Sequence, residues 1–591
     1  MKYLATATLL AACIAEPPKP GQMCMATSDC ASGEVCQDGV CWGDPPTGMF
    51  AATLGPPSNR ADLVGSEIAQ LAIPQDGWLG SISLAAPVQF AGRVEAYCAP
   101  AGSACDTSSL GATITITRES EFAGGPGFSA VIASSDGVAR STNSFSAAVP
   151  VTGATDSPFV VTVVPDGRDP TPPSSGVSPA TLAPPMRTTI TAMTDTSTTF
   201  VLGGADAQTI DGTITNGLSP LAKYRVAALG QWDPTTPLAE VSTVVYTTDG
   251  TYHLVLASGV TGPFTIVASP DDPTMVAPTL YLDSIAAGAT QTVLTQPANL
   301  GEPLQVTIPI QGAQSNGSVA GVSGATVTVT GEYTSTLTGA ARAQLTAQAV
   351  TDDTGNAVVT LLGGSALRSV YRVSVVPPAS SSLAVIYDQP LVLDASANAS
   401  TTVAALRLPS RIALSGKVVD TGGNPLNNVS VTARPSLRFL WSLDPVAAQF
   451  VAEIPAATAV TPDTGEFVVW VDPYVADVWG HYDLAFEPST GASAPDWTQA
   501  DIEIPRVQSQ TVDALDPIAI PDAAYIHGQL VDPDGNSVAN GELRIFELMT
   551  DLSLCSMVPN APPSCPIPAQ LVAHGTSDDT GTVQVALPRA Q

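Results

Sequence analysis

The stretch that decides the fold runs from GKVVDTGGNPLNNVSVTA (416–433) through TPDTGEFVVWV (461–471) to YDLAFEP (482–488). In each segment apolar residues alternate with polar ones, which is the pattern of a β-strand with one buried face. The first two segments contain Thr-Gly, and glycine there supplies the positive φ that a tight hairpin needs. Because every strand buries one face, the segments together predict two sheets packed against each other.

The same phrases recur along the chain. Four strand-like phrases, FVVTVVP, FTIVASP, YRVSVVP and YDLAFEP, end in prolines about 105 to 111 residues apart, at Pro165, Pro270, Pro377 and Pro488. Acidic turns followed by an alternating strand recur at Gly250, Gly355, Gly465 and Gly581, and a first strand recurs at Gly92, Gly212, Gly312, Gly416 and Gly528. Each unit therefore contains about seven short strands, which is the size of a β-sandwich domain.

The opening stretch resembles the carboxypeptidase regulatory-like domain, and that resemblance implies a transthyretin-like β-sandwich. The match is best at 404–520, whereas 521–591 matches only the first two-thirds of the pattern and the earlier units match more loosely. An immunoglobulin-like sandwich is the alternative fold. The resemblance covers an accessory sandwich and no catalytic domain. None of the histidines, at 253, 481, 527 and 574, has a glutamate three residues on, so the zinc motif of the peptidases is absent and we expect no enzyme.

We therefore predict an all-β protein, a tandem array of about five Ig-like or transthyretin-like β-sandwiches after a short disulfide-rich N-terminal segment. The predicted parts are 1–12 (signal peptide), 13–47 (lipid anchor and cysteine-rich segment), 48–195, 196–295, 296–403 and 404–520 (sandwiches 1 to 4), and 521–591 (sandwich 5). Counting on from Gly581 places the last proline-ended strand beyond Gln591. Sandwich 5 is thus expected to be incomplete, with an open edge. A truncated or degenerate last unit is the favoured explanation, and an edge that accepts a strand from a partner is the alternative.

The composition limits the partners. Asp and Glu number 53 against 21 Lys and Arg, which gives a net charge of −32. Like charge repels nucleic acid, so we expect no nucleic-acid partner. Only 13% of the residues are charged and 44% are hydrophobic, a balance that favours buried cores over acidic disorder.

The N-terminus reads MKYLATATLLAAC (1–13). A lysine followed by a short apolar run that ends in small residues is typical of a secretory signal. Leu10-Ala11-Ala12-Cys13 resembles the lipobox of bacterial lipoproteins, which implies that Cys13 is the acylated, mature N-terminus. A buried cysteine in an apolar strand is the alternative. With a lipid on Cys13, we expect an exported, membrane-anchored lipoprotein at the outer membrane or cell surface.

The other eight cysteines fall into even local groups: Cys24, Cys30, Cys36 and Cys41; Cys98 and Cys105; Cys555 and Cys565. Even groups in an exported chain predict disulfides. The segment CMATSDCASGEVCQDGVC (24–41) resembles a cysteine-rich module of the Dickkopf N-terminal type, which recurs just after the lipobox in exported bacterial proteins. It contains no CxxC pair, so zinc is disfavoured, and its connectivity stays open. We interpret it as a disulfide-stapled spacer, because so short a segment builds no core alone.

Candidate binding residues are few. Trp470, Trp479 and Tyr482 lie on neighbouring predicted strands, where aromatic faces would stack on a sugar ring. Packing in the sandwich core is the simpler explanation for all three, so they are candidates only if the protein has a carbohydrate site.

Three acidic segments faintly match calcium loops: Asp352-Asp353, Asp578-Asp579 and Asp532-Pro-Asp534-Gly-Asn536. None has the full spacing of a calcium-binding loop, and each coincides with a predicted hairpin turn. We therefore interpret them as turns and expect no metal, no cofactor and no catalytic residue.

These features predict a non-enzymatic surface lipoprotein, in which stacked sandwiches form a rod that serves as a stalk or as a binding and adhesion protein. A carbohydrate-binding protein of the cell envelope is the alternative, followed by an accessory subunit of a secreted hydrolase. The expected partners are the membrane, through the N-terminal lipid, and a protein or polysaccharide of the envelope.

Overall fold

The regular structure is almost entirely β, which confirms the predicted all-β class. The computed structural model describes residues 24–30, 34–37, 40–43, 48–96, 111–123, 125–134, 144–151, 158–165, 183–191, 194, 196–204, 207–234, 236–272, 275–313, 318–333, 341–368, 370–393, 400–489, 494–504, 512–548 and 569–589. Within these ranges the strands form five β-sandwiches and a small cysteine-rich module.

Sandwich 1 shows the topology that the five sandwiches share. Its strands are β6 (Val88–Ala96), β7 (Ala112–Arg118), β8 (Phe128–Ala133), β9 (Phe145–Val149), β10 (Phe159–Pro165), β11 (Met186–Ile190) and β12 (Thr196–Leu202). A four-stranded sheet, β11-β10-β7-β8, packs on a three-stranded sheet, β12-β6-β9. The last strand, β12, returns parallel to the first, β6, and all other pairs are antiparallel. The core between the sheets is apolar and includes Phe90 and Phe159.

Sandwiches 2 and 3 repeat this arrangement and share a sheet. Sandwich 2 comprises β13 (Thr209–Thr215), β14 (Tyr224–Gln231), β15 (Ala239–Glu240), β16 (Val245–Tyr246), β17 (Thr251–Val255), β18 (Thr261–Pro270), β19 (Thr279–Ile285) and β20 (Thr292–Thr295). Sandwich 3 comprises β21 (Pro303–Ala313), β22 (Val319–Gly321), β23 (Thr326–Tyr333), β24 (Arg342–Val350), β25 (Asn356–Leu362), α1 (Ser365–Arg368), β26 (Tyr371–Val376), β27 (Ile386–Pro390), β28 (Ser400–Thr402) and β29 (Leu406–Arg407). Strand β19 pairs with both β18 and β24, so one nine-stranded sheet runs through both sandwiches and holds them together.

Sandwich 4 carries two helices between its second and third strands. It comprises β30 (Ile412–Val419), β31 (Val429–Pro435), α2 (Leu437–Ser442), α3 (Pro445–Ala452), β32 (Ala457–Val460), β33 (Glu466–Val471), β34 (Tyr474–Val475), β35 (Val478–Trp479), β36 (His481–Pro488), β37 (Trp497–Glu503), β38 (Val512–Ala514) and β39 (Ile518–Ala519). Helix α3 begins because the carboxylate of Asp444 accepts the first backbone N–H groups and Pro445 fits the first helical position. Phe439 and Val451 bury the apolar sides of the two helices against the core.

The fifth sandwich is built from both ends of the chain, and we call it the closing sandwich. It comprises β3 (Phe50–Gly55), β4 (Ser66–Leu71) and β5 (Trp78–Ser83) together with β40 (Ala523–Val531), β41 (Glu542–Glu547), β42 (Gln570–Thr576) and β43 (Thr582–Pro588). Its sheets are β4-β3-β41-β42 and β43-β40-β5. Strand β3 pairs with β41 as β36 pairs with β31 in sandwich 4, and β5 lies parallel to β40 as β38 lies parallel to β30. The closing sandwich is therefore a circularly permuted copy of the common fold.

This pairing corrects the predicted domain boundaries. The predicted unit 48–195 is divided between two cores, because Phe50 and Leu54 pack with the C-terminal strands whereas Phe90 and Phe159 belong to sandwich 1. Sandwich 1 also extends through β12 into the predicted unit 196–295. The described part of 521–591 supplies four strands, in line with the missing proline-ended strand. The expected open edge does not exist, because β3 covers β41 from Phe50 to Gly55.

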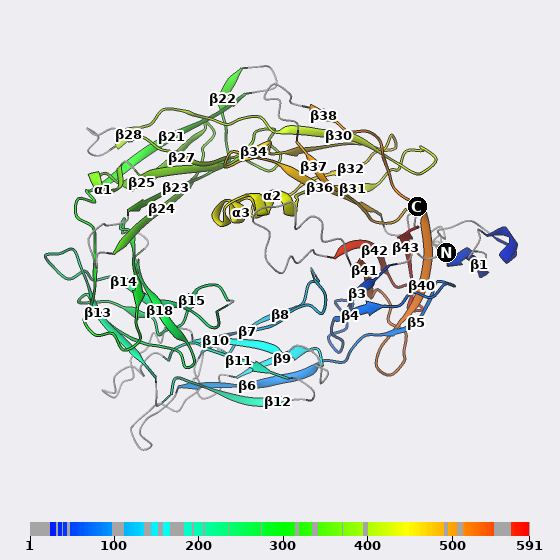
Figure 1. Ribbon diagram of the computed structural model, residues 1–591, viewed down its shortest axis with the longest axis horizontal. Helices are drawn as coiled ribbons and strands as arrows, with labels where there is room; N and C mark the ends of the chain where they lie inside the picture. The colour runs from blue at the N-terminus through cyan, green and yellow to red at the C-terminus, as the bar shows by residue number, and fades with distance from the viewer. Residues whose placement is uncertain are drawn as a thin grey trace, which may run out of the picture.

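The five sandwiches follow one another around a ring, and the two ends of the chain meet at the closing sandwich (Figure 1). A rod of stacked domains was the expectation from the tandem repeat, and the structure corrects it. The reason is that the first and last strands of the repeat share one core, which brings the N-terminal and C-terminal units together.

The cysteine-rich module contains η1 (Thr27–Asp29), β1 (Glu34–Gln37) and β2 (Val40–Gly43). Disulfides join Cys24 to Cys36 and Cys30 to Cys41, which settles the connectivity that the sequence left open. Among the helices of the described segments, none has both the length and the apolar character needed to cross a membrane.

Candidate functional site: the junction that closes the ring

The junction of the two chain ends is held first by an apolar core. On β3, Phe50, Ala52 and Leu54 are buried and pack with Leu543 and Ile545 of β41. Alternation along FAATLG (50–55) places these side chains on the inner face of the sheet, as it does in the proline-ended strands of the other sandwiches. Burial of the Phe50 or Leu54 side chain stabilises the junction by about 1.5–3 kcal/mol relative to exposure, and burial of the Ala52 methyl group by about 0.8 kcal/mol.

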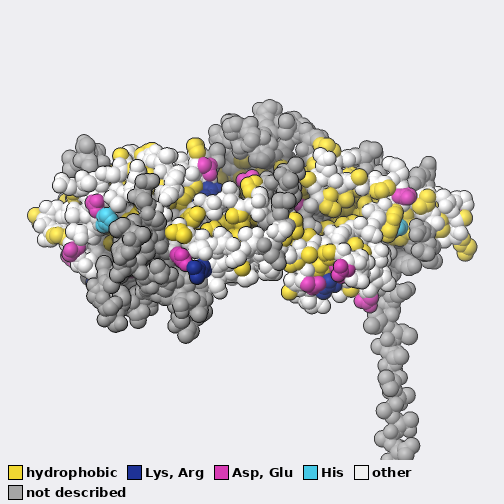
Figure 2. Space-filling view, turned by 90° about the horizontal axis from the view of Figure 1, so that it is seen from below, with side chains coloured by type: hydrophobic (Ala, Val, Ile, Leu, Met, Phe, Trp, Pro, Cys, Tyr) yellow, Lys and Arg dark blue, Asp and Glu magenta, His cyan; other side chains and the backbone are white. Residues whose placement is uncertain are grey.

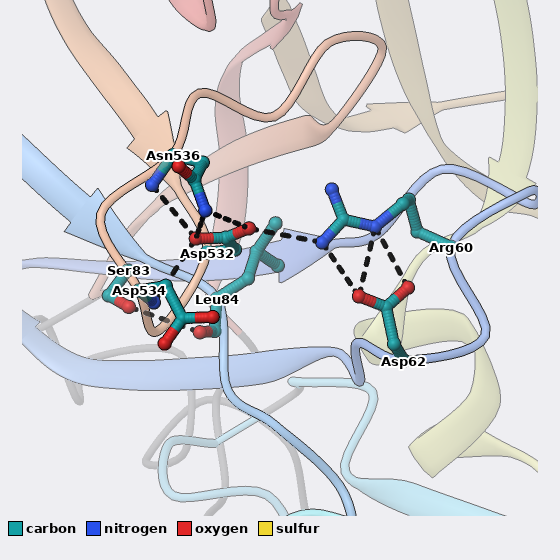
Figure 3. A network of polar contacts seen from close by, with 7 residues as sticks. All are labelled: Arg60, Asp62, Ser83, Leu84, Asp532, Asp534 and Asn536. Atoms are coloured by element: carbon teal, nitrogen blue, oxygen red, sulfur yellow. Dashed lines mark hydrogen bonds and ion pairs between the residues drawn. The ribbon is translucent and has the colours of Figure 1, made fainter.

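A polar network lies at the rim of this core (Figure 3). The guanidinium of Arg60 donates to Asp62 at 2.7 Å and to Asp532 at 3.2 Å, so it bridges the N-terminal and C-terminal parts. Asp532 also accepts the backbone N–H of Asp534 and, at 2.8 Å, that of Asn536. The hydrogen bond from Asn536 is the main cause that lowers the pKa of Asp532, and the carboxylate is therefore ionised where it meets Arg60.

Backbone contacts continue the junction beyond the strands. The N–H of Leu84 donates to the carbonyl of Val531 at 2.9 Å, next to the parallel pairing of β5 with β40. The Ser83 hydroxyl donates to the carbonyl of Leu84 at 3.1 Å. These bonds fix the point at which the chain leaves the closing sandwich for sandwich 1.

Glu67 on β4 ties the closing sandwich to sandwich 1. Its carboxylate accepts the Ser120 hydroxyl at 3.0 Å and the backbone N–H groups of Glu121 and Gly127 at 2.8 and 2.9 Å. The rings of Phe122 and Phe546 lie 5.3 Å apart beside this contact. One carboxylate thus orders the loop that enters β8.

Sandwich 4 meets the closing sandwich on its other side. Nδ1 of His574 on β42 lies 2.7 Å from a carboxylate oxygen of Asp496, which is buried. The Asp496 hydrogen bond is the main cause that raises the pKa of His574, while partial burial opposes it. The Thr421 hydroxyl also contacts the Asp522 carboxylate across this boundary.

The cysteine-rich module packs on the closing sandwich at β40. Trp42 is buried, with its ring 4.0 Å from the imidazole of His527, and Trp78 lies 5.0 Å from the same imidazole. Glu34 forms an ion pair with Arg589. All four cysteines of the module are in disulfides, so their thiolates are not free to bind zinc. The cysteine-rich segment, interpreted from the sequence as a spacer, is therefore a module packed on the closing sandwich.

The three aromatic residues proposed for sugar stacking do not form one platform. Tyr482 is buried, and its hydroxyl donates to the Asp472 carbonyl at 2.9 Å. Trp479 packs edge-on against Tyr474 at 5.7 Å between ring centroids. Trp470 is 37% exposed on the outer face of β33. The alternation of buried and exposed positions separates residues that are close in sequence.

A small cavity lies beside Trp470. It measures about 20 Å³, enough for about one water molecule, and its lining includes Pro455, Val475, Arg411, Asp472 and Tyr482. Two of these lining residues, Arg411 and Asp472, form a buried ion pair. Arg411 also donates to the carbonyls of Ala379 and Ser381, and Asp472 accepts the N–H of Val385. These side chains therefore hold the boundary between sandwiches 3 and 4 together, and their polar groups are used in that contact.

The acidic segments considered for calcium act as turns. Oδ1 of Asp352 accepts the backbone N–H groups of Thr354 and Asn356, and Oδ1 of Asp578 accepts those of Thr580 and Thr582. Asp532 does the same in the network described above. Each carboxylate thereby replaces a backbone acceptor in a hairpin, as the turn interpretation predicts.

Several charged side chains elsewhere are also paired. The face shown in Figure 2 carries them in small separate groups, several of which place an acidic next to a basic side chain. Arg225 and Glu240 form such a pair at 2.6 Å, and Arg372 and Asp388 another.

One cluster of reactive residue types escaped the sequence analysis. Asp501, at a φ of 53°, accepts the Ser436 hydroxyl at 3.2 Å and the Arg438 guanidinium at 3.0 Å, and lies 3.1 Å from Nδ1 of His481. The hydroxyl faces the carboxylate and not the imidazole, so the histidine is not placed to activate the serine as a nucleophile. Ser436 also caps α2 by accepting the N–H of Phe439, which gives the cluster a structural role.

Five predicted site residues lie outside the described residues: Cys13, Cys98, Cys105, Cys555 and Cys565. Lipid attachment at Cys13 and the pairing of the other four stay predictions. The ion pair between Arg60 and Asp532 was not predicted from the sequence. A signal for the junction was present in FAATLGPP (50–57), an apolar strand-like segment that ends in proline like the strands of the other sandwiches.

No protein-family model matches the sequence, and no curated protein matches it. The chain is similar to solved structures of a streptococcal ancillary pilin (10% identity, 53% of this chain and 99% of that one, TM-score 0.19) and of the Bacillus anthracis TIE protein (11% identity, 73% of each chain, TM-score 0.16). It is also similar to the RrgB pilus protein from Streptococcus pneumoniae (7% identity, 74% of this chain and 99% of that one, TM-score 0.14). At such TM-scores the similarity is too slight to assign a function.

Proposed function

We propose that the protein is a non-enzymatic, exported protein of the cell envelope, in which a ring of β-sandwiches is held at a membrane by a lipid on Cys13. The observation that carries the proposal is the disulfide-bonded module docked on the closing sandwich. Two disulfides in so short a segment are typical of an oxidising compartment outside the cytoplasm. The module directly follows the lipobox-like segment, so the ring would be presented to the surroundings from its closing sandwich.

A role in binding or adhesion agrees better than catalysis with the structural roles of the acidic and serine side chains described above. Several carboxylates of the described residues have structural roles, in turns at Asp352 and Asp578 and in a buried ion pair at Asp472. Ser436, whose hydroxyl shares the Asp501 carboxylate with His481, caps a helix. We therefore propose a scaffold that displays its outer surfaces to a protein or polysaccharide of the envelope.

Anchoring is tested in a bacterium that processes lipoproteins. We expect the full-length chain to fractionate with membranes, to lack its first twelve residues and to carry acyl mass on Cys13. Cys13→Ser should release it. A matched control, Cys24→Ser with Cys36→Ser, removes one disulfide and leaves the lipobox intact, so it should stay with the membranes. A mature chain that begins at Met1 would contradict the proposal.

Carbohydrate binding is a second candidate, favoured by the exposed ring of Trp470 and by Tyr474, which is 39% exposed. We expect Trp470→Ala to abolish retention of the protein on cell-wall polysaccharide if this surface binds sugar. Tyr482→Phe is the control, because its ring is internal. Equal retention of wild type and Trp470→Ala would exclude Trp470 as a sugar-stacking residue.

A further inference from the structure

We propose that the N-terminal part of the closing sandwich can be exchanged between molecules, so that a second copy of this chain completes the sandwich. We call residues 48–83, which contain β3, β4 and β5, the donor segment. Residues 520–548 and 569–589, which contain β40 to β43, are the acceptor half. The inference concerns the ring itself and is independent of how the protein is anchored.

Neither part has a complete core. The buried residues of the donor segment, such as Ala52 and Leu54, make their core with Leu543 and Ile545 of the acceptor half. Each sheet of the closing sandwich contains strands from both parts, since β3 pairs with β41 and β5 pairs with β40. Without the donor segment the acceptor half exposes one edge in each sheet, together with half of an apolar core.

The contact between the donor segment and the acceptor half is specific and non-covalent. The pairing of β3 with β41 runs without a register shift from Phe50 to Gly55, and Arg60 adds its ion pair to Asp532. Among the described residues no disulfide joins the two parts. Along the chain the donor segment is joined to sandwich 1 by residues 84–87, between β5 and β6, of which Leu84 is still bonded to Val531. Its contact with sandwich 1 through Glu67 is non-covalent. A short chain connection such as 84–87 is a natural hinge for exchange of an element between copies.

The donor segment of a second copy offers the same strands and side chains. Within one chain, the ring holds the two parts close together, so their effective concentration favours self-closure in dilute solution. Where chains are concentrated, as on a membrane surface, the donor segment of a neighbouring copy competes with the chain's own donor segment for the acceptor half. The docked module, with Trp42 against His527, would move together with the donor segment.

Exchange joins two different surfaces, the donor segment of one copy and the acceptor half of the next. Reciprocal exchange between two copies fills both acceptor halves and closes as a dimer. Exchange passed on from one copy to the next yields larger rings or open chains of molecules.

A complementation experiment tests this proposal with the full chain. Ala52→Glu puts a charge in the core position of β3 and disables the donor segment, whereas Leu543→Glu disables the acceptor half; both residues are fully buried. Each variant keeps one intact part. Refolded together, the two should form a 1:1 heterodimer of twice the monomer mass by native mass spectrometry, because the donor segment of Leu543→Glu completes the acceptor half of Ala52→Glu.

The control pair is Ala52→Glu with Ile82→Glu. Both changes lie in the donor segment, and Ile82 is also buried in the closing sandwich. This mixture has no intact donor segment and should give no heterodimer. A monomeric Ala52→Glu and Leu543→Glu mixture overturns the proposal, and so does an equal yield of dimer from the control pair, since that would show non-specific association.

Wild-type protein gives a readout that depends on no variant. Refolded from denaturant, it should be monomeric at low concentration, with a fraction of dimers and larger oligomers that rises as the protein concentration is increased tenfold and a hundredfold. Wild-type protein that stays monomeric at every concentration contradicts exchange.

Discussion

At the scale of single residues, the buried pair of Arg411 and Asp472 fixes how sandwich 4 meets sandwich 3. The two side chains are 4% and 5% exposed, and desolvation raises the pKa of Asp472 although Arg411 opposes the shift. A buried pair gains little over an apolar pair, but removal of one partner leaves the other charge uncompensated. The hydrogen bonds of Arg411 to the carbonyls of Ala379 and Ser381 would be lost as well.

We expect Arg411→Met to lower the free energy of unfolding of sandwich 4 by about 3–5 kcal/mol. Tryptophan fluorescence during urea unfolding measures it, because this sandwich holds four of the seven tryptophans, at 441, 470, 479 and 497. The control is Arg434→Met, whose exposed side chain lies 4.0 Å from Glu487. It should change the free energy by less than about 1 kcal/mol. Equal effects of the two substitutions would contradict the role assigned to Arg411.

His574 should make the contact between sandwich 4 and the closing sandwich depend on pH. Its pKa is raised, chiefly by the hydrogen bond to Asp496; Glu487 raises it further, while burial and Arg544 lower it. A raised histidine pKa contributes stability that is fully present below its unfolded value of about 6.5 and is lost as the pH rises through the folded value. The contact is therefore expected to weaken towards alkaline pH.

The free energy of unfolding, measured from below pH 6.5 to alkaline pH, should decrease with rising pH for wild type and not for His574→Asn. Histidine ring resonances in NMR should place the pKa of His574 above 6.5 directly. His253→Asn serves as the control, because His253 and its partner Asp211 are exposed on sandwich 2. A pKa of His574 at or below the ordinary value would refute the assignment.

At the scale of elements, the hairpin turns decide where each strand starts. Gly355 has a φ of 85°, and a Cβ there would lie 2.6 Å from the carbonyl oxygen of Ile310 and from the Cα of Gly321. Gly324, in the same sandwich, has a φ of 74°, but the nearest contact of its Cβ is ordinary, 3.4 Å from Pro378. The positive φ favours glycine at both positions, and only at Gly355 does the neighbouring backbone also leave no room for a Cβ atom.

We expect Gly324→Ala to destabilise sandwich 3 by about 1–2 kcal/mol, the cost of a left-handed conformation. Gly355→Ala should lower stability by a further 1–3 kcal/mol or so, because the backbone of two strands must move apart. Hydrogen exchange of peptides from β21 and β25, read by mass spectrometry, reports the difference. The prediction is wrong if the two variants exchange at the same rate.

At the scale of the whole molecule, the closing sandwich makes the array a ring. Ala52→Glu should open it in dilute solution, because a charge cannot be buried among Leu543 and Ile545 without a partner. X-ray scattering should then show a larger maximum dimension than that of wild type. Thr53→Gln is the matched control, since Thr53 lies on the other face of β3, between Arg544 and Glu67, and an uncharged side chain there does not repel Glu67. An unchanged maximum dimension in Ala52→Glu would show that the ring does not depend on β3.

Much of the architecture was predictable from local pattern. Alternation in FVVTVVP or YDLAFEP gives strands with one buried face, and turns such as that at Gly465 join them, so the seven-stranded unit follows from short-range chemistry. The turn role of Asp352 and Asp578 was predictable for the same reason, since the acceptors and donors lie within four residues of each other. The even local groups of cysteines predicted disulfides, but four cysteines allow three connectivities, and only the fold selects one.

The amino-acid sequence by itself determined the class of fold and the repeat of about seven strands, because these depend on local alternation and on turns within one unit. The tertiary structure alone decided that FAATLG (50–55) pairs with β41, that the array closes into a ring, and that Tyr482 is internal while Trp470 is exposed. Pairing across the whole length of the chain leaves no local signal: β3 looks like any proline-ended strand, and the partner that buries its apolar face is chosen by which core lacks a strand.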